Sequence, residues 1–306
     1  MSKYILLTGG TGFIGSHLLE KLLNLNKKVI LLKRSFSNTW RLNEFIRNKK
    51  LVEINTDEIN LNDIFNQFDI HGVFHLATYA PRSHESKDIS NMIDSNINFP
   101  TQLLENSVNN NVKFFINTGS FFEYELNNSP ISEINKIKSF NLYASTKTAF
   151  EDILKFYCEN YDLMCSTLKL FTPYGPKDDE NKLIPYLIIN SIQKKNLLIK
   201  SPTKKLDFIY VKDIVDCYIT LMNNISKLQQ YESFNMGTGI GTTIKDVLKI
   251  IEYNLGKNEH ITYGKLEDEQ VWCSNKKLKE ILNWSPKTNL ENGLKYTIDF
   301  YNKIYK

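Results

Sequence analysis

The chain has 306 residues, of which 42% are hydrophobic and 24% charged, a composition that excludes a disordered or low-complexity protein. The formal net charge of +4 is small and the lysines are spread along the sequence, so nucleic acid is not an expected partner. The four cysteines show no disulfide-framework or metal-motif spacing, and no apolar run reaches membrane-spanning length. We therefore expect a cytoplasmic protein without a metal site or a membrane segment.

The first half of the chain alternates short apolar runs with longer amphipathic ones. Strand patterns cover 4–8, 29–32, 72–77 and 113–117, and helix patterns run to about residue 25 and over 89–108. The second strand pattern is continuously apolar, as in a strand buried on both faces. The alternation predicts an α/β fold with a doubly wound parallel sheet of the Rossmann type.

The pattern of expected elements changes after about residue 170, where prolines separate shorter helices and strands. Helix patterns follow over 183–194, 211–223, 243–254 and 290–302. We expect a dinucleotide-binding domain over 1–170 and a smaller α/β substrate-binding domain over 171–306, with some later segments returning to the first domain.

A glycine-rich turn joins the first strand pattern to the first helix pattern, reading Gly-Gly-Thr-Gly-Phe-Ile-Gly from position 9. Glycine lets the backbone turn sharply and approach a pyrophosphate, whose oxygens the amides of a helix N-terminus can bind. Strand, turn and helix in this order predict a dinucleotide site. Its expected contacts are Gly9, Thr11, Gly12, Phe13, Ile14 and Gly15.

The end of the second strand bears on which dinucleotide is bound. NAD enzymes usually carry an acidic residue there, which binds the ribose hydroxyls and repels a 2′-phosphate. This chain has Lys33, Arg34 and Ser35 instead, two cations and a hydroxyl that attract a phosphate. We therefore predict NADP, the alternative being NAD bound beside a solvated basic turn.

Tyr143 and Lys147 are four residues apart on one face of a predicted helix, and Ser120 ends a strand pattern earlier in the chain. A carbonyl that accepts hydride becomes an alkoxide, which needs a proton donor and hydrogen-bond donors. An ammonium lowers the pKa of a nearby phenol. These three residues are therefore the predicted catalytic group, unless they are a surface pair and a strand-capping serine.

Together the glycine turn, Ser120, Tyr143 and Lys147 resemble the extended short-chain dehydrogenase/reductases over essentially the whole chain. The resemblance implies that the cofactor cleft is also lined by Leu76, Ala77, Thr78, Asn96, Thr118 and Phe171. It implies a sugar nucleotide contacted by Arg82, His84, Phe121, Thr172, Lys182, Leu183, Lys205 and Lys265. The last two lysines stand in for a pyrophosphate-binding arginine, because Leu206 occupies its usual place. The alternative for His84 is a solvated loop histidine.

The residues after Ser120 bear on the reaction. Dehydratases of this family carry an Asp-Glu pair there, whereas this chain has Phe121 and Phe122, which cannot move protons, and Glu123 comes one position later. Stretches 115–120, 168–180 and 207–213 resemble the CDP-paratose and CDP-abequose synthases. This implies NADPH-dependent reduction of the 4-keto group of a nucleotide-diphosphate (deoxy)sugar, for surface polysaccharide.

Two alternatives to a reductase stay open. One is a nucleotide-sugar 4-epimerase or 4-dehydrogenase, and the other, of a different class, is a non-catalytic NADP-sensing or scaffold protein. The family resemblance also implies a homodimer formed through helices near 96–108 and 143–161. Phe150, Leu154 and Tyr157 would supply apolar contacts in it, unless they form part of the core.

Overall fold

The computed structural model describes residues 3–81, 84–126, 129–266 and 270–306. Contacts between residues divide the chain into two compact units. The first comprises Met1–Tyr124, Lys136–Lys169 and Cys217–Phe234, and the second comprises Glu125–Asn135, Leu170–Asp216 and Asn235–Lys306. The assignment of one unit to the dinucleotide and the other to the sugar nucleotide stays a prediction.

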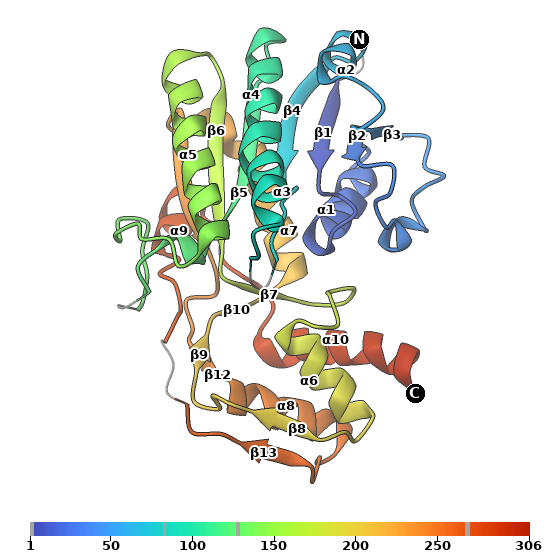
Figure 1. Ribbon diagram of the computed structural model, residues 1–306, viewed down its shortest axis with the longest axis vertical. Helices are drawn as coiled ribbons and strands as arrows, with labels where there is room; N and C mark the ends of the chain where they lie inside the picture. The colour runs from blue at the N-terminus through green and yellow to red at the C-terminus, as the bar shows by residue number, and fades with distance from the viewer. Residues whose placement is uncertain (1–2, 82–83, 127–128, 267–269) are drawn as a thin grey trace. The chain divides into compact units, whose positions relative to one another are not determined.

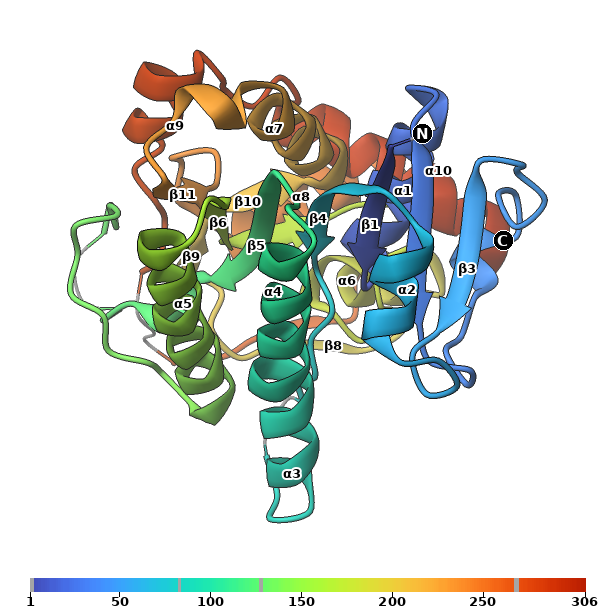
Figure 2. The ribbon, with the colours of Figure 1, turned by 90° about the horizontal axis from the view of Figure 1, so that it is seen from above.

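A seven-stranded parallel sheet forms the centre of the first unit, in the order β11-β6-β5-β4-β1-β2-β3 (Figures 1 and 2). Its strands are β1 (Tyr4–Thr8), β2 (Lys28–Lys33), β3 (Leu51–Asn55), β4 (Ile70–His75), β5 (Phe114–Ser120), β6 (Met164–Leu170) and β11 (Tyr231–Met236). The strand order reverses between β1 and β4, the kind of position at which open α/β sheets bind ligands. The predicted doubly wound fold is confirmed.

Helices connect these strands. They are α1 (Phe13–Asn24), η1 (Trp40–Leu42), α2 (Leu61–Gln67), α3 (Asp88–Ile93), the π-helical turn η2 (Asp94–Asn98), α4 (Phe99–Asn109), η3 (Phe121–Glu123), α5 (Leu142–Asn160), α7 (Val211–Asn224) and η4 (Ile225–Lys227). The helix expected over 89–108 is a continuous helical run made of α3, η2 and α4. The expected strand 72–77 ends two residues early, at His75.

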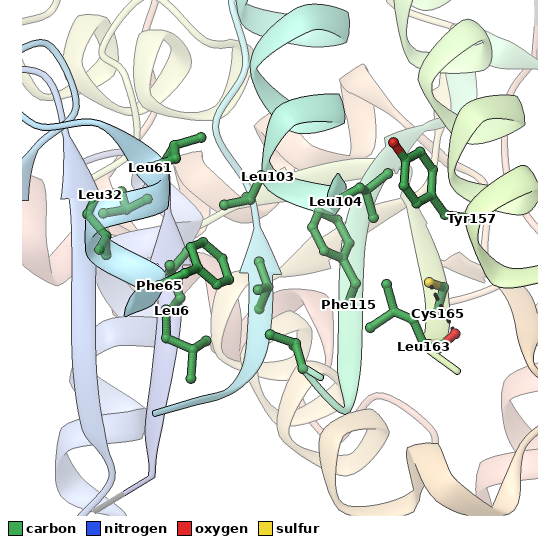
Figure 3. Packing of buried hydrophobic residues seen from close by; sticks show 14 of the residues in the cluster. Leu6, Leu32, Leu61, Phe65, Leu103, Leu104, Phe115, Tyr157, Leu163 and Cys165 are labelled. Atoms are coloured by element: carbon green, nitrogen blue, oxygen red, sulfur yellow. Dashed lines mark hydrogen bonds between the residues drawn. The ribbon is translucent and has the colours of Figure 1, made fainter. Parts of the chain in front are cut away.

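One face of the sheet carries α2, α4 and α5, and Figure 3 shows the apolar side chains between these layers. Leu6 and Phe115 point from the sheet into this cluster and are 0% exposed. Because side chains alternate along a strand, Leu7 and Phe74 point to the opposite face, where Phe74 packs edge-on against Tyr218 of α7. Both faces are therefore buried, which explains the continuously apolar strands.

The apolar stripe of α5 also belongs to this core. Phe150 and Leu154 are 0% exposed and Tyr157 is 9% exposed. Of the two alternatives for this stripe, the core face is confirmed and the dimer contacts are not, because these three side chains pack in the cluster between the sheet and its helices.

The second unit has short sheets and four further helices. Its elements are β7 (Thr172–Tyr174), α6 (Leu183–Ile192), β8 (Leu197–Ile199), β9 (Lys205–Leu206), β10 (Phe208–Tyr210), β12 (Thr242–Thr243), α8 (Ile244–Leu255), β13 (Ile261–Tyr263), α9 (Lys276–Leu282) and α10 (Leu290–Tyr305). Strands pair as β10-β7, β12-β9 and β13-β8. Within the described ranges, every helix of the protein is too short or too polar to cross a membrane.

Asp207 holds the second unit together from within. Its carboxylate is 0% exposed and accepts hydrogen bonds from the backbone amides of Thr238, Gly239 and Cys273, at 2.6, 2.9 and 3.2 Å. The Thr238 hydroxyl donates a further bond at 2.6 Å. Buried charge is tolerated only when it is hydrogen-bonded, so this carboxylate joins three segments that are far apart in the sequence.

Candidate active site

The glycine turn after β1 is packed too tightly for side chains. Gly9 has φ +71°, and a Cβ placed on it would lie 2.5 Å from the amide nitrogen of Ala77. A Cβ on Gly15 would overlap the carbonyl oxygen of Gly9. Helix α1 begins at Phe13 without a side-chain cap and without an acidic residue in its first turn. The turn thus presents helix N-terminal amides without a competing carboxylate, as a pyrophosphate site requires.

Thr8 holds the segment that faces this turn. Its hydroxyl oxygen accepts a hydrogen bond from the Ala77 amide at 3.2 Å and lies 2.9 Å from Nδ1 of His75. Burial lowers the pKa of His75 well below its usual range, so the ring is neutral. Leu76 and Ala77 therefore lie just past β4, against Gly9, where the cofactor cleft was expected.

Asn96 fixes the next two residues of that segment. Its side-chain oxygen accepts from the Thr78 hydroxyl at 3.0 Å and from the Tyr79 amide at 2.8 Å. Its side-chain nitrogen donates to the Tyr79 carbonyl and to the Thr146 hydroxyl, both at 3.0 Å. The side chain is 1% exposed and all its hydrogen-bonding capacity is used, so Asn96 fixes residues 78–79, and its expected contact with a cofactor stays a prediction.

Helix α5 carries Tyr143 and Lys147 one turn apart, and it begins where Asn141 accepts a hydrogen bond from the Ala144 amide at 2.9 Å. Burial raises the pKa of Tyr143 to about 12, although the Thr78 hydroxyl acts in the opposite direction. Burial lowers the pKa of Lys147 to about 8. Lys147 is only 3% exposed, so its side chain lies inside the first unit.

Ser120 ends β5 and is 8% exposed. Its hydroxyl oxygen accepts a hydrogen bond from the Phe122 amide at 3.3 Å, which leaves the hydroxyl hydrogen for another acceptor. The η3 turn that follows Ser120 contacts α5, the helix of Tyr143 and Lys147. The three predicted catalytic residues thus come from adjoining elements of one unit.

A buried charge cluster lies behind Ser120. Glu123 accepts the Ser120 amide at 2.6 Å and lies 2.9 Å from the ammonium of Lys169. The same ammonium lies 2.7 Å from Glu151, whose other oxygen accepts from the Tyr231 hydroxyl at 2.6 Å. Burial raises the pKa of Glu123 to about 7. Both oxygens of the Glu123 carboxyl group have hydrogen-bond partners in this cluster, so Glu123 is not placed to act as the acid of a dehydratase.

At the end of β2, two of the three residues predicted to bind a 2′-phosphate have other partners. The ammonium of Lys33 donates to the side-chain oxygen of Asn55 at 2.8 Å. The amide and hydroxyl of Ser35 donate to Asp57 at 2.8 and 2.5 Å. Arg34 is exposed, with its guanidinium 4.7 Å from the centre of the Phe36 ring. Arg34 is thus the cation that is available to a phosphate.

Four further predicted residues belong to the first unit. The Thr118 hydroxyl lies 2.6 Å from the Tyr218 hydroxyl, and Phe121 is buried with its ring 4.1 Å from that of Phe122. His84 is exposed, whereas Arg82 lies outside the described residues.

The remaining predicted residues belong to the second unit. Phe171 is buried and its amide donates to the backbone carbonyl of Met236, and the amide of Thr172 in β7 donates to the backbone carbonyl of Asp207 at 3.0 Å. The other four lie at element ends or edges and are half-buried or exposed: Lys182 and Leu183 at the start of α6, Lys205 in β9 and Lys265 after β13. The Lys205 ammonium lies 5.9 Å from the Trp272 ring.

Sequence patterns alone did not show that Glu151 and Lys169 pair beside the predicted catalytic residues, or that Asp57 binds Ser35. They also did not show that Glu123 accepts the Ser120 amide. One available signal was the four-residue spacing from Tyr143 through Lys147 to Glu151, which places all three on one helical face. A lysine between two leucines in a buried strand was another, because such a charge needs a partner.

Comparison with known proteins confirms the expected family. Residues 5–237 match the NAD dependent epimerase/dehydratase family. The chain is 29% identical to a CDP-abequose synthase of Salmonella typhimurium, over 96% of this chain and 97% of that protein. It is 30% identical to a UDP-glucuronate 4-epimerase of Thermodesulfobacterium geofontis, over 97% and 95%. The structure of UDP-glucuronic acid 4-epimerase from Bacillus cereus with UDP-glucuronic acid and NAD matches with a TM-score of 0.89 at 26% identity, covering 99% of this chain and 100% of that chain.

Proposed function

Because the chain belongs to the NAD-dependent epimerase/dehydratase family, we propose that it reduces the 4-keto group of a nucleotide-diphosphate deoxysugar with NADPH. The family and its relatives make the chain an enzyme that modifies nucleotide sugars. The observation that carries the reductase proposal is the Tyr143 and Lys147 pair. The buried side chain of Lys147 lies one helical turn from the half-buried phenol of Tyr143. This pair suits proton delivery to a carbonyl oxygen.

The residues fit a dinucleotide cofactor. The crowded glycine turn and the uncapped start of α1 would hold a pyrophosphate, and Lys147 would hold the ribose next to the nicotinamide. Arg34 would bind the 2′-phosphate that distinguishes NADPH from NADH. When bound, NADPH supplies the hydride that the carbonyl carbon accepts.

The chain's own residues manage the proton and the developing charge. Tyr143 donates its phenolic proton to the carbonyl oxygen as negative charge develops there. Ser120 donates a hydrogen bond to the same oxygen, since its hydroxyl hydrogen is available. Lys147 stabilises the phenolate that remains on Tyr143 after proton transfer.

Two observations argue against dehydration. Phe121 and Phe122 follow Ser120 and carry no group that can transfer a proton. Glu123, the first acidic residue after them, donates nothing to the site because Ser120, Lys169 and the cluster around Glu151 occupy its carboxyl group.

A second candidate is a 4-epimerase that retains its cofactor. It is favoured by the UDP-glucuronate 4-epimerase relative and by the likeness to the Bacillus cereus epimerase. The same three residues serve this reaction, because oxidation and return of hydride at one carbon use the same acid and base in opposite directions.

The test mixes purified protein with NADPH and a CDP-4-keto-6-deoxyhexose, and follows the absorbance of reduced nicotinamide. We expect stoichiometric consumption, a hydroxyl at C4 in the product by NMR, and faster turnover with NADPH than with NADH. Interconversion of UDP-glucuronate and its C4 epimer without net cofactor consumption would instead establish the epimerase. The proposal fails if no 4-keto sugar nucleotide oxidises NADPH.

The setting of the reaction is part of the same proposal. All four cysteines are free, which suits a reducing cytoplasm, and the CDP-abequose synthase relatives suit a sugar destined for surface polysaccharide.

We propose a homodimer formed through α4 and α5, with apolar contact from Phe156 and Tyr161, which are 55% and 43% exposed. Sedimentation of wild type and Phe156→Glu tests it, with a monomeric wild type as the contrary result.

A further inference from the structure

The buried cluster of Glu123, Glu151 and Lys169 transfers no proton or hydride in the proposed reaction. Two carboxylates share one ammonium, so the cluster carries a net charge of −1 when both carboxylates are ionised. Lys155 approaches Glu151 at 3.6 Å from the solvent side, whereas Glu123 is 0% exposed. Such an arrangement is costly to bury, and a well-packed apolar group would be less so.

The cluster reaches the candidate catalytic residues along α5. Tyr143, Lys147 and Glu151 are spaced by four residues, so their side chains follow one another along a single helical face. Glu151 therefore lies one turn beyond Lys147 and connects to Glu123 through the shared ammonium of Lys169. Figure 1 shows α5 running alongside β5 and β6, the strands that bear Ser120 and Lys169.

The cluster also reaches the site through the backbone. Glu123 is the last residue of η3, the turn that starts directly after Ser120. One carboxylate oxygen accepts the Ser120 amide at 2.6 Å, and the Ser120 hydroxyl in return accepts the Phe122 amide, which together form a capping box. The orientation of Ser120 therefore depends on Glu123.

We propose that Glu123 is a positioning residue for the proposed reduction: its carboxylate fixes the backbone of Ser120 and keeps both protons on the Tyr143 and Lys147 pair. This inference rests on the proposed function. A pair that holds both protons is the form that delivers one to a carbonyl oxygen as hydride arrives.

Electrostatics support the direction of this effect. Burial is the main cause of the raised pKa of Tyr143, and the charge of Glu123 raises it further. Burial lowers the pKa of Lys147, and the charge of Glu123 opposes that fall. Because the two groups interact, the first proton lost belongs to the pair, and a nearby negative charge delays that loss whichever group gives it up.

Other charged groups surround Glu123 on each packed element. Lys169 contacts it from β6 and also contacts Glu151 of α5, and the charge of Glu123 acts on Lys147 and Tyr143 of the same helix. Behind these, Tyr231 donates to Glu151, and the Lys169 ammonium lies 4.8 Å from the Tyr124 ring. With its own pKa raised to about 7 by burial, Glu123 is ionised in the alkaline range, where the pair would begin to lose protons.

The test compares Glu123→Gln with Glu151→Gln. In the first variant, the glutamine amide keeps an oxygen for the Ser120 amide but carries no charge. Glu151→Gln is the matched control, because it removes a carboxylate from the same cluster without removing the charge that acts on the pair. The measurement is kcat/KM for ketone reduction against pH.

We expect the alkaline limb of the profile to move about one pH unit lower in Glu123→Gln and to stay in place in Glu151→Gln. An unmoved limb in Glu123→Gln, or an equal movement in both variants, overturns the proposal. If Glu123→Gln does not fold, Glu123→Gln/Glu151→Gln/Lys169→Met leaves the cluster without charge, so the same lowering of the alkaline limb is expected and an unmoved limb overturns the proposal.

A second measurement needs no turnover. In protein labelled with ¹³C at tyrosine Cζ and lysine Cε and saturated with NADP⁺, NMR follows ionisation of the pair, with signals assigned by Tyr143→Phe and Lys147→Met. Earlier proton loss in Glu123→Gln supports the effect of Glu123 even if no sugar nucleotide is reduced, in which case only the proposed function fails. Unchanged titration in a protein that does reduce its substrate overturns the effect of Glu123 alone.

Discussion

The side-chain nitrogen of Asn96 donates a hydrogen bond to the hydroxyl of Thr146, 50 positions away, at 3.0 Å. Thr146 in turn donates to the carbonyl of Tyr143 at 2.7 Å, so a π-helical turn is tied to the helical turn that bears the candidate proton donor. Single π-turns occur inside helices frequently at functional sites. Here the π-helical turn places the side-chain amide of Asn96 where it bonds both residues 78–79 and Thr146 of α5.

We expect Asn96→Ala to lower the free energy of unfolding by about 1–3 kcal/mol, because the Tyr79 amide and carbonyl lose their buried partner. It should also lower kcat more than it weakens cofactor binding, since Thr78 and Tyr143 lose their alignment. Urea unfolding and steady-state kinetics measure the two effects. Asn110→Ala, at an exposed site on the end of α4, is the control and should leave both unchanged.

Tyr143→Phe should reduce turnover by about 10²–10⁴-fold, because the ring remains and the transferable proton is lost. Binding of NADPH, followed by fluorescence, should change little. The chain contains a matched control in Tyr253, which also precedes a lysine by four residues but is 90% exposed. Full turnover in Tyr143→Phe, or an equal loss in Tyr253→Phe, would contradict the assigned proton donor.

Lys147→Met should make the protein more stable and inactive. Burial lowers the pKa of Lys147 from 10.5 to about 8, so below pH 8 the folded protein retains a buried charge that costs about 3 kcal/mol. Between pH 8 and 10.5 the unfolded chain binds the extra proton, and wild-type stability therefore rises with pH.

The gain in Lys147→Met should accordingly be largest near pH 7 and should shrink toward pH 10.5. Urea unfolding at several pH values measures it, with Lys295→Met on the exposed side of α10 as the control. A destabilised Lys147→Met protein at pH 7 would contradict the inferred cost of burying this charge.

Arg34→Ala should weaken NADPH binding by about 10- to 100-fold and leave NADH binding nearly unchanged, because a charge-assisted contact to the 2′-phosphate is lost. Dissociation constants for both dinucleotides measure the difference. Asp57→Asn should act in the opposite sense, since it removes a carboxylate that holds Ser35. Arg47→Ala, another exposed arginine, is the control. Tighter binding of NADH than NADPH by wild type would refute the NADP prediction.

Local patterns in the sequence were sufficient for much of the fold. The glycine turn, the buried strand β2 and helix α6 each depend on neighbours within a few positions, and all three lie where they were expected. Strand β4 runs from Ile70 to His75, so the predicted strand 72–77 was placed two residues too late along the chain. Leu76 and Ala77 lie beyond its end, where their backbone approaches Gly9.

Long-range pairings could not be predicted in this way. Lys33 was expected to meet a phosphate but donates to Asn55 on the neighbouring strand, and Ser35 donates to Asp57. Glu123 and Lys169 are 46 positions apart, and the residues next to either one do not indicate that the two interact. Such partners depend on strand register and on which helix face is buried, which only the assembled sheet determines.

The Asp207 carboxylate has a consequence for the order in which the protein is made. Its hydrogen-bond donors come from positions up to 66 residues later in the chain, at Cys273. A ribosome adds about 5–20 residues per second, so the nascent chain carries this carboxylate for several seconds before its last donor emerges. Until then the charge must remain hydrated, and the second unit can close around it only after Cys273 has emerged.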